Sequence, residues 1–74
     1  MERENKMIEI DIRGDYIKLG QLLKLVGAVS SGSEAKEAVG SGKVFVNHEP
    51  VFERGKKLHS GDLIHFENYS VHLN

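Results

Sequence analysis

Apolar and polar residues alternate near the start of the chain. Ile8, Ile10 and Ile12 are separated by acidic residues, which is the period-two pattern of a strand with one buried face. An Arg-Gly-Asp sequence follows at residues 13–15, and both glycine and aspartate favour turns. The pattern therefore predicts a half-buried strand that ends at this turn.

The spacing of apolar residues then changes to that of a helix. Leu19, Leu22, Leu23 and Val26 stand at positions i, i+3, i+4 and i+7, so they share one face of a helix. Gly27 is suited to end this helix, because glycine adopts the backbone conformation that terminates helices at little cost. We expect a short amphipathic helix with polar residues on its opposite side.

A second helix is predicted in the segment SSGSEAKEAVGSG. Ser31 and Glu34 have the S-x-x-E spacing in which each side chain can accept a hydrogen bond from an amide at the helix start. Gly40 weakens the helix by about 1 kcal/mol relative to alanine, and Gly42 is well placed as a C-terminal cap. The apolar face is narrow and consists of small residues that allow close packing on the first helix: Ala35, Ala38 and Val39.

Two short apolar runs flank Asn47 and His48 and indicate a β-hairpin. The runs are Val44–Val46 and Pro50–Phe52, and a two-residue turn between them requires positive φ angles. Glycine is the usual second residue of such a turn, but histidine is among the non-glycine residues that tolerate this conformation. His48 is therefore interpreted as a tolerated departure.

The last third of the chain completes the sheet. Leu58, Ile64 and Phe66 are further core candidates, and Tyr69, Val71 and Leu73 alternate as a final strand. The predicted order is strand, helix, helix, hairpin, strand and strand. This order corresponds to an α+β fold in which two short helices pack on a small antiparallel sheet.

The 74 residues are expected to form one domain, residues 1–74, since a chain of this size supports a single modest core. There is no cysteine, which excludes disulfides, thiolate metal sites and a cysteine nucleophile, and favours a reducing, cytoplasmic location. The first ten residues are charged where a signal peptide or membrane helix would be apolar. Neither secretion nor membrane association is expected.

The net charge of −1 is unusual for a nucleic-acid-binding domain, which is commonly basic. The charges are unevenly distributed, however. Residues 1–15 hold three basic and five acidic side chains, whereas residues 16–66 hold seven basic and five acidic ones. The centre of the chain is mildly basic between acidic ends.

No arrangement of side chains indicates catalysis. The four histidines, at positions 48, 59, 65 and 72, lack metal-ligand spacing, and the glycines lack the lysine-serine ending of a phosphate-binding loop. No Ser/His/Asp arrangement can be assigned. We expect a protein that is not an enzyme and needs no metal, cofactor or small-molecule substrate.

The elements together resemble a known family. Residues 17–66 contain KLGQLLKLVG, the SxSEAK start of the second helix, GKVFVNH leading into the turn, and a closing GD-I-F. In this order they resemble the RNA-binding domain named after small-subunit ribosomal protein S-four, also called the alpha-L motif. In sequence, these segments look most similar to the small stand-alone bacterial members of the YaaA or YbcJ type.

The resemblance implies an RNA-binding surface made by the start of the first helix, the start of the second and the hairpin. Carried over by position, the family's contact residues fall on Lys18, Ser31, Lys36, Lys43 and Asn47. Gly32 stands where many members have a phosphate-binding arginine, and His48 where they have glycine. These two departures imply weaker binding or a different partner geometry.

Phosphate chemistry supports the same surface. Helix starts present unpaired amides, glycine lets the backbone approach a ligand closely, and lysines supply phosphate contacts that do not depend on sequence. The few aromatic residues argue against stacking of single-stranded bases. The full predicted set is Lys18, Gln21, Lys24, Ser31, Gly32, Ser33, Lys36, Lys43, Asn47, His48, Lys56 and Lys57.

Two hypotheses of function follow. The first is a monomeric, non-enzymatic protein that binds structured RNA, ribosomal or transfer RNA, in the bacterial cytoplasm. The second is a protein-interaction adaptor that keeps the fold and docks a partner through its acidic ends or through exposed apolar residues such as Leu25 or Phe45.

Overall fold

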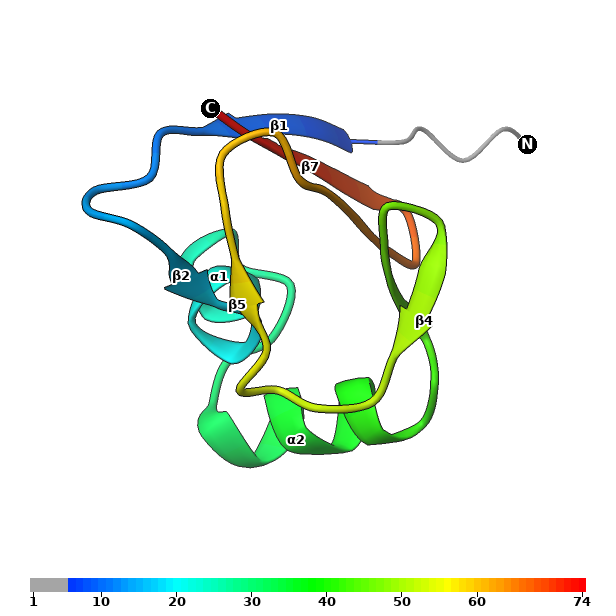
Figure 1. The fold of residues 1–74 in the computed structure, drawn as a ribbon. Coiled ribbons are helices and arrows are strands. Elements are labelled where there is room, and N and C mark those ends of the chain that lie inside the picture. Colours follow the sequence, from blue (N-terminus) through cyan, green and yellow to red (C-terminus); the bar gives the residue numbers. More distant parts are fainter. Residues whose placement is uncertain (1–5) are drawn as a thin grey trace.

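The computed structural model describes residues 6–74, and Figure 1 shows the arrangement of its elements. Two helices and five of the seven strands follow the predicted order, and the other two strands, of two residues each, were not predicted. In chain order the elements are β1 (Lys6–Ile10), β2 (Ile17–Lys18), α1 (Leu19–Leu25), α2 (Gly32–Gly40), β3 (Val44–Val46), β4 (Glu49–Val51), β5 (Lys57–Leu58), β6 (Leu63–Phe66) and β7 (Tyr69–Leu73).

Five strands form one sheet in the order β1-β7-β6-β3-β4, and β2 pairs with β5 in a separate small sheet. The predicted α+β class is confirmed, but the larger sheet is mixed. Strand β1 runs parallel to β7, with Ile8 opposite Val71 and Ile10 opposite Leu73, whereas the other pairs are antiparallel. A parallel pair needs a long connection between its strands, and here the whole intervening chain provides it.

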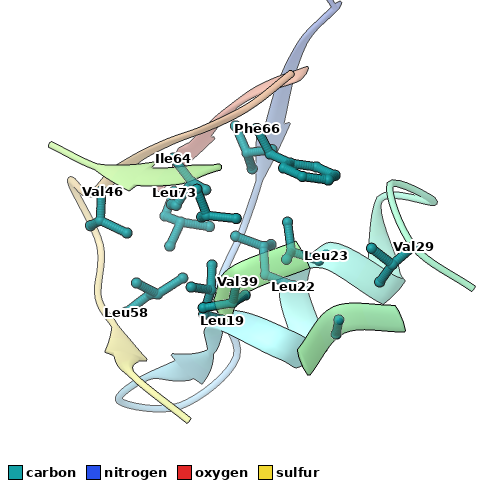
Figure 2. Close-up of a cluster of buried hydrophobic side chains, with 13 residues drawn as sticks. Leu19, Leu22, Leu23, Val29, Val39, Val46, Leu58, Ile64, Phe66 and Leu73 are labelled. Atoms are coloured by element: carbon teal, nitrogen blue, oxygen red, sulfur yellow. The ribbon is translucent and has the colours of Figure 1, made fainter. Parts of the chain in front are cut away.

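The core lies between the five-stranded sheet and the two helices, as Figure 2 shows. Leu19, Leu22 and Leu23 of α1 are at most 1% exposed and face this core, which confirms the predicted apolar face of the first helix. Burial of each such leucine contributes about 1.5–3 kcal/mol. They meet Ile64 and Leu73 from the sheet, which are equally buried.

Helix α2 begins as the sequence predicted. The Ser31 Oγ accepts a hydrogen bond from the Glu34 amide at 3.1 Å, and the Glu34 carboxylate accepts one from the Ser30 amide at 3.0 Å. Ala35 and Val39 are the buried residues of this helix. Gly42 follows the helix with a φ of +79°, so the predicted terminating glycine is confirmed.

The hairpin between β3 and β4 has the predicted turn. Asn47 and His48 have φ angles of +51° and +72°. The Asn47 side chain also connects the turn to the chain before β6, since its Nδ2 donates to Asp62 Oδ1 at 3.1 Å and its Oδ1 accepts from the Leu63 amide at 3.0 Å. The asparagine thus fixes the hairpin against the rest of the sheet.

Neither helix of the described chain is long and apolar enough to cross a membrane.

Candidate nucleic-acid interface

The segment that connects β4 to β5 shapes the candidate site. Figure 1 shows this segment passing along α2 before it enters β5 beside β2. Its backbone carbonyls accept hydrogen bonds from the first amides of α1: Leu19 donates to Lys56 at 2.9 Å and Gly20 donates to Arg54 at 2.8 Å. The start of α1 is therefore capped by a loop from more than thirty residues later in the chain.

The side chain of Arg54 extends from this loop to the start of α2. Its Nη1 donates a hydrogen bond to the Gly32 carbonyl at 2.9 Å. A β-carbon at Gly32 would lie 3.4 Å from that nitrogen, and one at Gly20 would lie 3.4 Å from the Arg54 Cβ. The two glycines thus allow the loop and its arginine to approach both helices closely.

A cleft of about 250 Å³ opens between the two helices and the loop. Its polar side chains can all donate hydrogen bonds, and among residues 6–74 no Asp or Glu lines it. Small residues supply the remaining wall. The lining residues are Lys18, Gly20, Gln21, Lys24, Gly32, Ala35, Arg54 and Gly55.

Gln21 has two roles at this cleft. Its Oε1 accepts a hydrogen bond from the Lys18 amide at 3.2 Å, which stabilises the first turn of α1. That bond uses the acceptor end of the side-chain amide and leaves the Nε2 donor for a ligand. Three cations and one amide donor therefore surround the cleft, and this set of groups is suited to an anion.

Lys57 extends the basic surface beyond the cleft. It stands directly opposite Lys18 in the pairing of β2 with β5. Its Nζ lies 4.8 Å from the centre of the Tyr16 ring, which is a cation–π distance. Lys56 is the last residue of the β4–β5 segment, directly before Lys57, and it is exposed. Its backbone carbonyl caps the start of α1.

The other predicted lysines do not join this group. Lys43 lies at a hollow that is also lined by Glu34, Glu37 and Glu67, so carboxylates surround it. Lys36 is exposed on α2 and does not line the cleft. The structure therefore brings together the predicted lysines of the first helix and the β5 region and leaves these two apart.

The hairpin residues are engaged elsewhere. Both ends of the Asn47 side-chain amide are used within the fold, as described above, and the His48 ring packs near the His65 ring with centroids 5.5 Å apart. The Ser31 hydroxyl caps α2. Ser33 is exposed in the first turn of that helix.

Arg54 is the residue that sequence reasoning missed. It follows the hairpin in a segment without helical or strand periodicity, so no pattern assigned it to a surface. One signal was available, because it is the single arginine in residues 16–66 and precedes a glycine and two lysines. Its position beside Gly32 depends on the tertiary docking of the loop.

The fold and the cleft define a small two-helix α+β domain with a cation-lined cleft. The S4 domain family matches residues 10–74, and the chain belongs to this family. The chain is also 42% identical over 60 residues to the probable ribosome maturation protein RlbA of Bacillus subtilis (strain 168). That match covers 81% of this chain and 84% of the relative. The resemblance expected from the sequence is confirmed.

Proposed function

We propose that this protein is a non-enzymatic RNA-binding module that recognises structured RNA, foremost ribosomal RNA, through phosphate contacts and shape. The observation that carries the proposal is the convergence of Lys18, Lys24 and Arg54 on a cleft that no carboxylate among residues 6–74 lines. The net charge of the protein is −1, so this local cluster of cations does not follow from an overall basic composition. Binding of a negatively charged phosphate backbone explains it.

The family and the relative point in the same direction. Membership of the S4 domain family and the ribosome maturation name of the relative indicate an RNA-binding role connected with ribosomes. The share of each chain covered by the match supports a comparable role for this protein as a whole. We expect it to act as a monomer in the bacterial cytoplasm.

Contact with phosphates, rather than with splayed bases, fits the residues at the cleft. Single-stranded bases are usually held by stacking on aromatic side chains. No Phe or Tyr among residues 6–74 lines the cleft. Lysine and arginine contacts to phosphates fix position without reading sequence, so recognition would depend on the shape of a folded RNA.

The adaptor hypothesis has less support. Leu25 and Phe45 are exposed, at 61% and 39%, but they lie on α1 and β3 and line separate hollows. They do not form one apolar patch of the kind that marks a protein interface. Part of the acidic N-terminal end, residues 1–5, lies outside the described residues.

The test is a binding titration of the protein with a folded fragment of ribosomal RNA at two salt concentrations. With about three phosphate contacts, affinity should fall by roughly one and a half to two powers of ten between 50 and 200 mM salt. An unstructured RNA of equal length should bind more weakly. Absence of binding at low salt would count against the proposal, and protein partners that persist in ribonuclease-treated lysate would favour the adaptor.

A further inference from the structure

We propose that Arg54 is the principal phosphate-binding residue of this surface, and that the cleft beside it takes a single backbone phosphate of the RNA. This inference rests on the proposed function and names the residue and the chemical group at its centre. Nothing in the linear pattern assigns Arg54 a role. The argument comes from its position, its fixed orientation and its missing counter-ion.

The position of Arg54 compensates for the missing arginine side chain at Gly32. The family resemblance places a phosphate-binding arginine at position 32, where this chain has no side chain. The Arg54 guanidinium lies beside that position, with Nη1 at 3.4 Å from where a β-carbon of residue 32 would stand. An arginine from the β4–β5 loop thus supplies a guanidinium next to the start of α2.

Arg54 is hydrogen-bonded at two points, once through its backbone and once through its side chain. Its backbone carbonyl accepts from the Gly20 amide at 2.8 Å, and its Nη1 donates to the Gly32 carbonyl at 2.9 Å. A guanidinium has five N–H donors, so one bond to Gly32 leaves the others for a ligand. A cation held in place loses less conformational entropy when it binds, and its planar fork matches two phosphate oxygens.

Arg54 also lacks a counter-ion within the fold. Among residues 6–74, no carboxylate oxygen lies within 4.0 Å of its guanidinium, and the one pair that meets this criterion is His72 with Glu9. A purely structural bridge to the Gly32 carbonyl would not need a positive charge, since a glutamine amide can donate the same bond. The charge instead adds to that of Lys18 and Lys24 around one cleft.

The experiment compares two variants that each remove one arginine charge. Arg54→Gln removes the proposed contact, and Arg13→Gln makes the same change at an exposed turn residue that does not line the cleft. The probe is the folded ribosomal RNA fragment, titrated at several salt concentrations. We expect Arg54→Gln to weaken binding about tenfold and to lower the salt slope by about one, and Arg13→Gln to weaken binding less than twofold.

A further variant separates charge from geometry and guards against a loss of folding. Arg54→Lys keeps the charge and can still donate to Gly32, but it lacks the planar fork. We expect it to bind about threefold more weakly than the wild type. Amide spectra of all variants, recorded without RNA, establish that they are folded. If Arg54→Gln fails to fold, the lysine variant decides the question.

The outcomes distinguish this inference from the proposed function. If the wild type binds RNA while Arg54→Gln and Arg13→Gln lose the same small amount, the role of Arg54 is overturned and the proposed function stands. Wild-type binding by Arg54→Lys would likewise overturn the role of the guanidinium. If the wild type itself does not bind folded RNA at low salt, the proposed function fails.

Discussion

Lys18 and Lys57 stand directly opposite each other in the two-stranded sheet of β2 and β5. Like charges at opposed positions destabilise a strand pair by a few tenths of a kcal/mol to about 1 kcal/mol. The Tyr16 ring beneath Lys57 offsets part of this cost. A fold that retains such a pair next to a cation-lined cleft is consistent with a surface shaped for binding rather than for stability.

The first prediction concerns this pair. Lys57→Glu should raise the free energy of unfolding by about 0.5 kcal/mol at low salt, because an opposite-charge pair replaces repulsion and outweighs the lost contact with Tyr16. The same variant should bind folded RNA several-fold more weakly. Urea denaturation and the RNA titration measure the two effects. The matched control is Lys36→Glu, which has no opposing lysine and should not gain stability; a Lys57 variant that is less stable than the wild type would refute the cost of the pair.

The second prediction concerns the hairpin turn. His48→Gly should increase the free energy of unfolding by about 0.5–1 kcal/mol, because glycine adopts the φ of +72° without the steric cost that histidine has there. His48→Ala serves as the control, since it removes the imidazole but keeps the β-carbon, and it should not stabilise the fold. Equal stabilisation by both variants would assign the effect to the ring and not to the turn.

The third prediction concerns the cap at the start of α2. Ser31→Ala should lower the free energy of unfolding by about 1 kcal/mol, since its Oγ accepts the Glu34 amide. Ser33→Ala changes a neighbouring exposed serine and should stay within about 0.5 kcal/mol of the wild type. Thermal unfolding followed by circular dichroism measures both. A larger loss of unfolding free energy in Ser33→Ala than in Ser31→Ala would contradict the assignment of Ser31 as the cap of α2.

The fourth prediction uses two glycines at the end of α2. Gly42→Ala should lower the free energy of unfolding by about 2 kcal/mol, because φ is +79° and the added carbon would lie 3.1 Å from Phe52 Cε1. Gly40→Ala should raise it by about 0.5–1 kcal/mol, since the same carbon meets nothing within 4 Å and alanine favours the helix. Urea denaturation of the two variants tests whether the changes in the free energy of unfolding have opposite signs.

The fold was predictable where periodicity and turn chemistry decide it. The leucines of α1, the Ser31–Glu34 start of α2 and the Asn47-His48 turn carry local signals that tertiary packing reinforced. The parallel pairing of β1 with β7 was not predictable, because alternation at Ile8 and Ile10 fixes a strand's buried face but not the direction of its partner.

The site was predictable only in part. Lys18, Gln21, Lys24 and Gly32 do line one cleft, because one side of α1 lies beside the start of α2. Lys43 was assigned to the same surface by position in the chain, but it lies among carboxylates at another hollow. Arg54 was missed because backbone hydrogen bonds between distant segments, which no local pattern encodes, place it at the cleft.

The most direct measurement is an amide chemical-shift titration of the ¹⁵N-labelled protein with a folded ribosomal RNA fragment. The central claim predicts the largest changes around the cleft, at Lys18, Gly20, Gln21, Gly32 and Gly55. Largest changes around Lys43 and Glu67, with the cleft amides unaffected, would contradict it.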